Sequence, residues 1–100
     1  MKETNGHRSW NAWECYNSLS NSYNDVEYYQ NALEEAFEKY PDDLKKARKN
    51  FGGAMFRRYS GERTEGGGIY NTMTLRGIIE MLWDSELKYK EEFNHEKLHH

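Results

Sequence analysis

The residues that could perform chemistry are few in this 100-residue chain, and they are widely separated. Cys15 is the one cysteine, and the nearest histidine, His7, precedes it by eight positions. A thiol nucleophile needs a base within hydrogen-bond reach, and this spacing indicates no local geometry for one. His7, Cys15 and His95 also lack the spacing of a zinc half-site. The sequence therefore predicts neither a catalytic cysteine nor a metal site.

Glycine runs and paired carboxylates are the other chemical signals, and neither completes a motif. No Gly-Lys-Ser/Thr, the signature of a P-loop, follows the glycines of FGG (51–53) or EGGG (65–68). Glu34 and Glu35 fall on the polar face of a predicted helix, away from any recognisable cleft. We therefore expect a chain that is not an enzyme and that uses no cofactor.

Charge is unevenly divided along the chain, although the net charge is only −3. Residues 1–44 hold three basic and nine acidic side chains, and residues 77–100 hold three and six. The block between them, 45–76, holds eight basic and two acidic side chains. Its basic members are Lys45, Lys46, Arg48, Lys49, Arg57, Arg58, Arg63 and Arg76.

Three interpretations of the basic block 45–76 follow from its charge. Its lysines and arginines could track a nucleic-acid backbone while Phe56 or Tyr59 stacks on bases. The block could instead dock on an acidic patch of another protein, or it could pair internally with the acidic helix before it. Because the whole chain is negatively charged, we favour internal pairing. We therefore expect no appreciable DNA or RNA binding at physiological salt.

Hydrophobic spacing predicts an all-α fold, a small bundle of about four helices. Ser9 is the expected N-cap of a first helix over about residues 10–20. Three-residue spacing suits packing on an amphipathic helix, so we expect at least two of Trp10, Trp13 and Trp83 to be buried. These rings should join the first helix to the last. A large exposed patch containing Trp10 and Trp13 would instead mark an interface.

The second helix is expected to follow an Asn24 cap, and Pro41 should end it and open the third. Apolar side chains recur at steps of three and four in both helices. In the second they are Val26, Tyr29, Leu33, Phe37 and Tyr40, and in the third Leu44, Ala47, Phe51, either Ala54 or Met55, and Tyr59. Gly52 and Gly53 should bend or break the third helix, unless they allow another backbone to approach closely.

A glycine-rich loop over SGERTEGGG (60–68) is expected before the last helix, with a short hairpin across 56–70 as the alternative. Asn71 or Thr72 should cap the last helix, which continues toward Phe93. Its predicted apolar face is Leu75, Ile78, Ile79, Leu82, Trp83 and Leu87.

Composition indicates a single domain, 1–96, with a lean core. Leu, Ile, Val and Phe total 15 residues, so eight Tyr and three Trp must supply much of the buried area. A partner protein or a second copy of the chain could complete such a core. Residues 97–100, KLHH, look like a cloning scar followed by the start of a histidine tag. The lone cysteine and the lack of long apolar runs lead us to expect a cytoplasmic protein away from membranes.

The opening stretch resembles a known family. Its matching residues are Asn5, Gly6, Ser9, Trp10, Asn11, Asn24, Asp25 and a following tyrosine, Tyr28 or Tyr29. This pattern resembles the start of a family of small tailed-phage proteins of unknown function, with an Asn-Gly pair, a Thr-Trp-Asn core and an Asn-Asp turn. The likeness covers residues 5–29, and the family's usual second Trp is replaced by Cys15. The resemblance implies a phage or prophage origin more than a mechanism, since the family has no assigned catalytic residues to carry over.

Phage origin implies a function by class, because small non-enzymatic phage proteins often bind host proteins. We expect a protein that binds and inhibits or modulates a host protein in the host cytoplasm. The leading target is a defence nuclease of the CRISPR or restriction type. The alternative is a nucleic-acid-binding protein that uses the block 45–76.

The contact residues are expected in the loop YSGERTEGGGIY (59–70), unless that loop is only a mobile connection. Tyrosine and arginine are enriched among interface hot spots, and the glycines would let the loop adapt on docking. The acidic face of the second helix is the alternative surface. The predicted contact residues are Tyr59, Arg63, Tyr70, Arg57, Arg58, Glu34, Glu35 and Glu38.

Overall fold

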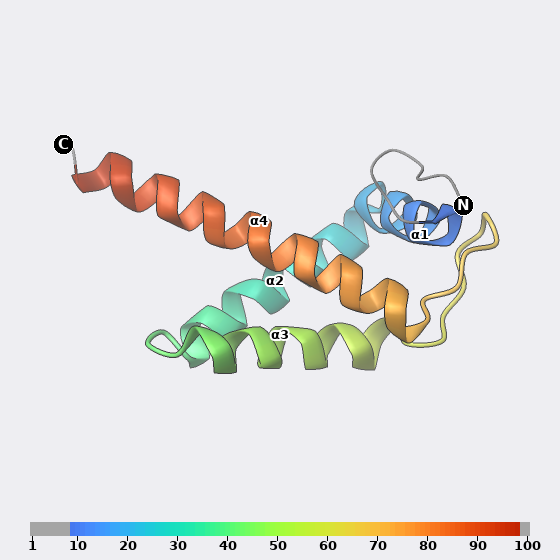
Figure 1. Ribbon diagram of the computed structural model, residues 1–100, viewed down its shortest axis with the longest axis horizontal. Helices are drawn as coiled ribbons and strands as arrows, with labels where there is room; N and C mark the ends of the chain where they lie inside the picture. The colour runs from blue at the N-terminus through green and yellow to red at the C-terminus, as the bar shows by residue number, and fades with distance from the viewer. Residues whose placement is uncertain (1–8, 99–100) are drawn as a thin grey trace.

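The chain folds into a bundle of four α-helices in a computed structural model that describes residues 9–98, with side chains to residue 92 (Figure 1). The helices are α1 (Trp10–Ser20), α2 (Tyr23–Lys39), α3 (Leu44–Tyr59) and α4 (Thr72–Leu98). No residue within 9–98 lies in a strand, and one isolated antiparallel bridge occurs before α4. The predicted all-α class is confirmed.

Two of the predicted helix caps are confirmed. The Ser9 hydroxyl accepts a hydrogen bond from the amide of Ala12 at 3.2 Å, and α1 begins directly after it. The Asn71 side-chain oxygen accepts from the amide of Thr74 at 2.8 Å, at the start of α4. Each cap satisfies an amide that has no partner inside the first turn of its helix.

The predicted starts of α2 and α3 were wrong by a few residues. Ser22, not Asn24, caps α2, and its hydroxyl accepts from the amide of Asp25 at 3.4 Å. Pro41 lies in the turn before α3 and not in the first turn of that helix. Asp43 caps α3 by accepting from the amide three residues further on, at 3.1 Å. In both cases the helix begins directly after the residue whose side chain caps it, Ser22 for α2 and Asp43 for α3.

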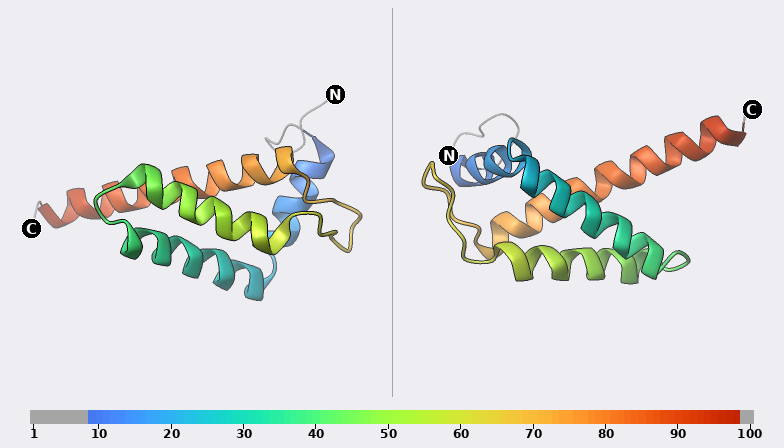
Figure 2. Two further views of the ribbon diagram at one scale, coloured as in Figure 1. Left: turned by 90° about the horizontal axis from the view of Figure 1, so that it is seen from below. Right: turned by 180° about the vertical axis from the view of Figure 1, so that it is seen from behind.

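The helices are arranged as an antiparallel pair, α2 and α3, crossed by α4 and closed at one end by α1 (Figure 1). α3 packs against both α2 and α4, and α1 closes the bundle by packing against the same two helices. Figure 2 shows the same order from two further directions, with the connection between α3 and α4 beside α1. The C-terminal part of α4 extends past the other helices.

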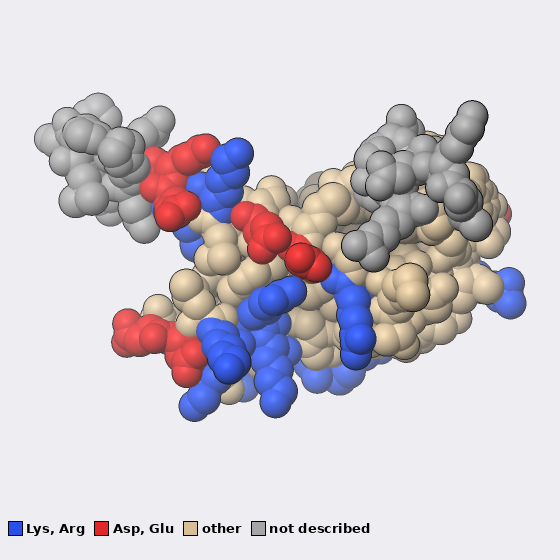
Figure 3. Space-filling model, in the orientation of Figure 1, with Lys and Arg blue, Asp and Glu red and all other residues tan. Residues whose placement is uncertain are grey.

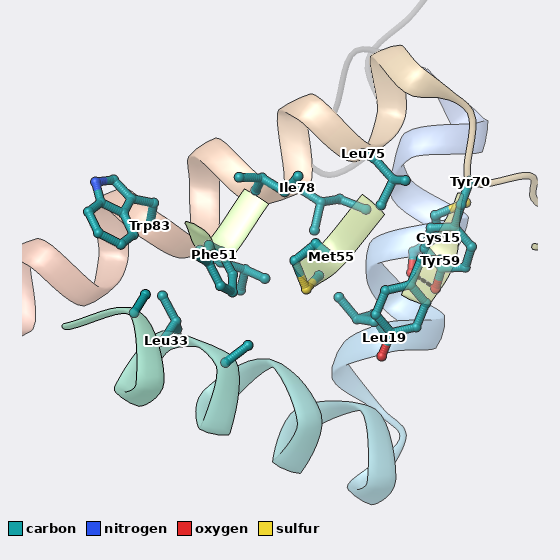
Figure 4. Packing of buried hydrophobic residues seen from close by; sticks show 14 of the residues in the cluster. Cys15, Leu19, Leu33, Phe51, Met55, Tyr59, Tyr70, Leu75, Ile78 and Trp83 are labelled. Carbon is teal, nitrogen blue, oxygen red and sulfur yellow. Dashed lines mark hydrogen bonds between the residues drawn. The ribbon is translucent and has the colours of Figure 1, made fainter. Parts of the chain in front are cut away.

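The core follows the predicted stripes of α3 and α4 (Figure 4), except that Leu44 at the start of α3 is 51% exposed and Leu87 on α4 is only partly buried. On α3 the buried residues are Ala47, Phe51, Met55 and Tyr59. On α4 they are Thr74, Leu75, Ile78, Ile79, Leu82 and Trp83. The spacing of three and four residues explains both stripes, since such residues share one face of a helix.

The prediction for the tryptophans was wrong in two respects. Only Trp83 is buried, at 3% exposure, whereas Trp10 is 48% exposed and Trp13 is half-buried. Trp83 stacks on Phe37 of α2, with ring centroids 4.8 Å apart, and so joins α4 to α2 and not to α1. At 100° per residue, Trp10 and Trp13 fall on the side of α1 opposite Cys15 and Leu19, its two buried residues.

The predicted break in α3 is also wrong, because the helix continues through both glycines. A Cβ atom added at Gly52 would lie 3.8 Å from Cγ2 of Ile79 on α4, which is an ordinary contact. The absence of a side chain there lets α4 lie close to α3. This close approach is the alternative that the sequence offered for Gly52 and Gly53. Packing against two helices therefore outweighs the low helix propensity of glycine.

A glycine inside α4 provides a first test of the fold. Gly77 is exposed, and an added Cβ there would meet no atom within 4 Å. Gly77→Ala should therefore raise the free energy of unfolding, measured by urea denaturation, by about 0.5–1 kcal/mol. Gly61→Ala should lower it by about 1–2 kcal/mol, because Gly61 has a φ of 81°. A loss of stability in Gly77→Ala would contradict the helix assigned here.

Candidate protein-binding surface

The glycine-rich connection between α3 and α4 folds into a hairpin. Arg63 and Ile69 face each other in an antiparallel bridge. The amide of Tyr70 donates to the carbonyl of Glu62 at 2.9 Å, and backbone bonds also close the turn beyond the bridge. Gly67 has a φ of 97°, a conformation that favours glycine. The short hairpin that the sequence offered as an alternative is therefore present in part, without regular strands.

Asn11 fixes this hairpin to both α1 and α4. Its side-chain nitrogen donates to the carbonyl of Ile69 at 2.9 Å and to the hydroxyl of Thr74 at 2.8 Å. Its side-chain oxygen accepts from the amide of Ile69 at 2.8 Å. One side chain thus makes three hydrogen bonds that span the sequence from the first helix to the last.

A second set of contacts holds the glycine turn against α1. The Thr64 hydroxyl donates to the Glu14 carboxylate at 2.5 Å and accepts from the amide of Gly68 at 2.8 Å. Gly68 is buried, and a Cβ atom there would lie 2.9 Å from Cγ of Glu14 and 3.1 Å from Sγ of Cys15. Glycine is therefore required at this position by close packing. The hairpin therefore packs against α1 and is hydrogen-bonded to it, and we call it the seated hairpin.

Two predicted contact residues belong to the core and not to the surface. Tyr59 and Tyr70 are 5% and 4% exposed, so neither ring is available to a partner. The Tyr59 hydroxyl donates to the Asp25 carboxylate at 2.7 Å, and the Tyr70 hydroxyl donates to the carbonyl of Cys15 at 3.1 Å. Burial is the main cause that raises the pKa of Tyr70 to about 12, and it raises the pKa of Tyr59 further. Both rings anchor the ends of the hairpin.

Four exposed side chains lie on the hairpin or on the helix ends next to it, and we call them the loop-end surface: Arg63 and Ile69 of the hairpin, Trp10 of α1 and Met73 of α4. Met73 is 78% exposed and Ile69 is 36% exposed. A Cβ atom at Gly67 would lie 3.9 Å from the ring of Trp10, which places that ring beside the turn. Asn11, the neighbour of Trp10, binds Ile69 and Thr74 directly, so α1, the hairpin and the start of α4 meet here (Figure 1).

The remaining predicted residues lie along α2 and α3. Glu34, Glu35 and Glu38 are exposed on α2, as expected. Glu35 and Glu38 line a groove of about 450 Å³ between α2 and α3, and Arg57 lines its other side. The guanidinium of Arg58 lies over the ring of Tyr28 at 5.4 Å from its centroid. Of the predicted arginines, only Arg63 belongs to the hairpin.

The Cys15 thiol is enclosed and protonated. Its side chain has no exposed surface, and burial, together with the charge of Glu14, raises the pKa of the thiol to about 11. The thiolate is the reactive form, so this group is not poised as a nucleophile at neutral pH. No cluster of three or more potential metal ligands occurs in the part of the chain that the structure describes. His7 and the side chain of His95 lie outside the described residues.

Of the loop-end surface, the sequence did not predict Met73, and it favoured a buried position for Trp10; Ile69 lies within the predicted contact loop 59–70. For Trp10 a signal was present, since the tryptophan lies opposite the pair Cys15 and Leu19 on a helical projection of α1. Nothing in the local sequence distinguishes Ile69 or Met73 from core residues. Their exposure depends on how the hairpin is seated on α1.

No family model, no curated protein and no solved structure matches this chain. The resemblance of residues 5–29 to small tailed-phage proteins therefore stays a prediction. Within residues 9–98, none of the helices combines the length and apolarity that crossing a membrane requires.

Proposed function

We propose that this chain is a non-enzymatic protein that binds and inhibits a host protein, with a defence nuclease as the leading target. The observation that supports this proposal is the loop-end surface, where Arg63 is exposed on a hairpin held by side-chain hydrogen bonds and Trp10 and Met73 are exposed on the adjoining helix ends. The target class comes from the phage resemblance and not from this geometry. The host cytoplasm is the compartment in which such an inhibitor would act.

The chemistry of the loop-end surface suits a protein partner. Tryptophan and arginine are the residue types most enriched among interface hot spots, and Met73 adds an adaptable apolar group. The hairpin is ordered before any partner arrives, so little conformational entropy remains to be lost on binding. A partner that fits offers an apolar pocket for Trp10 and a carboxylate for Arg63.

Two assays with matched variants test the proposal. Expression of the wild-type protein in host cells should raise the plating efficiency of a phage that the defence nuclease restricts. Immobilised protein should also capture that nuclease. Trp10→Ala with Arg63→Ala should weaken capture by about 30-fold or more, which corresponds to the loss of one hot spot. The control, Glu34→Gln with Glu35→Gln, should change neither result.

Two results would contradict the proposal. The first is an unchanged plating efficiency against every restriction and CRISPR system tested. The second is equal capture by the wild type and the Trp10/Arg63 variant, with far-ultraviolet circular dichroism showing that the variant is folded. The second result would keep a binding protein but would remove the loop-end surface as its contact site.

A further inference from the structure

The outward side of α3 carries a row of positive charge that the packing of the bundle leaves free. Ala47, Phe51, Met55 and Tyr59 define the buried side of this helix. At 100° per residue, the positions opposite that side are Lys46, Lys49, Gly53 and Arg57. The three charged members of this row are exposed. Figure 3 shows Lys and Arg gathered over α3, with acidic side chains along the neighbouring α4.

The internal pairing favoured from the sequence does not account for this row. α2 flanks α3 on the side of Ala54, where the Tyr28 hydroxyl donates to the Ala54 carbonyl at 3.1 Å. α4 flanks it on the side of Gly52. Lys46 and Lys49 project between these two sides, away from both neighbours. Arg57 lies at the rim of the α2–α3 groove, whose other side carries Glu35 and Glu38.

We infer that this outward face of α3, the row of Lys46, Lys49 and Arg57, binds the phosphate backbone of nucleic acid. The row extends over twelve residues, from 46 to 57, or about 16 Å along the helix axis. One strand of DNA presents a phosphate about every 3.4 Å of its axis, so the row can reach several of them. Gly53 lies at the middle of the row, and a guanidinium nitrogen of Arg57 lies 3.3 Å from the position that its Cβ would take, so Arg57 places its charge over the centre of the row.

The composition of the row favours nucleic acid over an acidic protein. Two of its three charged residues are lysines, and lysine is depleted in protein–protein interfaces but binds phosphate readily as a compact charge. No ring of this helix is available to stack on a base, because Tyr59 is buried and Phe56 is packed against the core. The expected binding is therefore independent of base sequence and sensitive to salt. It would be measurable at low salt and weak at physiological salt.

This inference does not depend on the proposed function and is tested separately. The probe is a fluorescein-labelled DNA duplex of about 20 base pairs, titrated with the full chain at 50 and 200 mM salt while anisotropy is recorded. Three neutralised phosphates predict a slope of log affinity against log salt of about −2.7, or about 40-fold weaker binding at the higher salt. Lys46→Gln with Lys49→Gln should reduce the slope to about −0.9.

The control variant, Arg76→Gln with Lys88→Gln, removes the same charge from exposed positions on α4 and should leave the slope near −2.7. Circular dichroism of both variants should match the wild type, because all four positions are exposed. The inference is overturned by any of three results. These are no binding at 50 mM salt, an equal loss in the control variant, or equally tight binding of poly-glutamate.

Discussion

Replacing Trp83 with Ala should lower the free energy of unfolding by about 3–5 kcal/mol. The ring is 3% exposed, stacks on Phe37 and lies 6.3 Å from the ring of Phe51, so it joins α4 to both α2 and α3. A domain of this size has a total stability of about 5–15 kcal/mol, so the loss is a large share of it. The measurement is urea denaturation followed by circular dichroism, and the midpoint of thermal unfolding should fall by about 15 °C or more.

Trp10→Ala is the matched control for the core. Its ring is 48% exposed at the end of the molecule, so the same truncation should cost about 1 kcal/mol or less. Equal losses in the two variants would mean that the N-terminal tryptophans share in the core, as the sequence pattern first predicted. The packing of α1 described above would then be wrong.

Gly68→Ala should lower the free energy of unfolding by about 1–3 kcal/mol, which is the cost of overpacking a close contact. The added Cβ would lie 2.9 Å from Cγ of Glu14 and 3.1 Å from both Sγ of Cys15 and the Thr64 hydroxyl. One of these groups must move, and the Thr64 hydroxyl is the group that binds the Gly68 amide. The hairpin should therefore loosen on α1, and urea denaturation should show the loss.

A double mutant shows whether this loss of stability comes from the contact between the hairpin and α1. Glu14→Ala removes the atom nearest to the added Cβ. Gly68→Ala should therefore cost less in the Glu14→Ala background than in the wild type, with a coupling energy of about 0.5 kcal/mol or more. Strictly additive losses would indicate that residues 14 and 68 are not in contact. The packing of the hairpin against α1 would then be contradicted.

The sequence predicted where the helices lie better than it predicted which side of α1 is buried. The stripes of α3 and α4 are long and regular, so their periodicity identifies the core. α1 has only 11 residues and buries two of them, Cys15 and Leu19. On such a short helix, two tryptophans suggest an apolar face, but the tertiary packing buries the opposite side of α1. Tertiary packing also overrides the glycine pair in α3.

The candidate surface could be predicted only in part. Its location at the glycine-rich segment and the exposure of Arg63 follow from the sequence, since turn residues and charged groups lie at surfaces. The roles of Tyr59 and Tyr70 could not be predicted, because their hydroxyls are satisfied by Asp25 and by the carbonyl of Cys15, both distant in sequence. A buried tyrosine needs such a partner, and only the fold shows that it has one.

The order of the seated hairpin reduces the conformational entropy that the protein would lose on binding a partner. Three consecutive glycines suggest a loop that adapts to its partner and loses entropy when it does so. Asn11, Glu14 and Thr64 instead order the turn in the free protein through hydrogen bonds to residues far along the chain. Variants that release the turn should therefore weaken binding of a protein partner even where they remove no contacting side chain.

The central claim, that the hairpin is held rigid on α1 as a preformed surface, is tested most directly by amide NMR relaxation in the free protein. The account predicts order parameters of about 0.8 or higher for the amides of Thr64, Gly68, Ile69 and Tyr70, similar to those of the helices. These amides make the hydrogen bonds that close and seat the turn. Values below about 0.6 across the hairpin would show a mobile connection and would contradict the account.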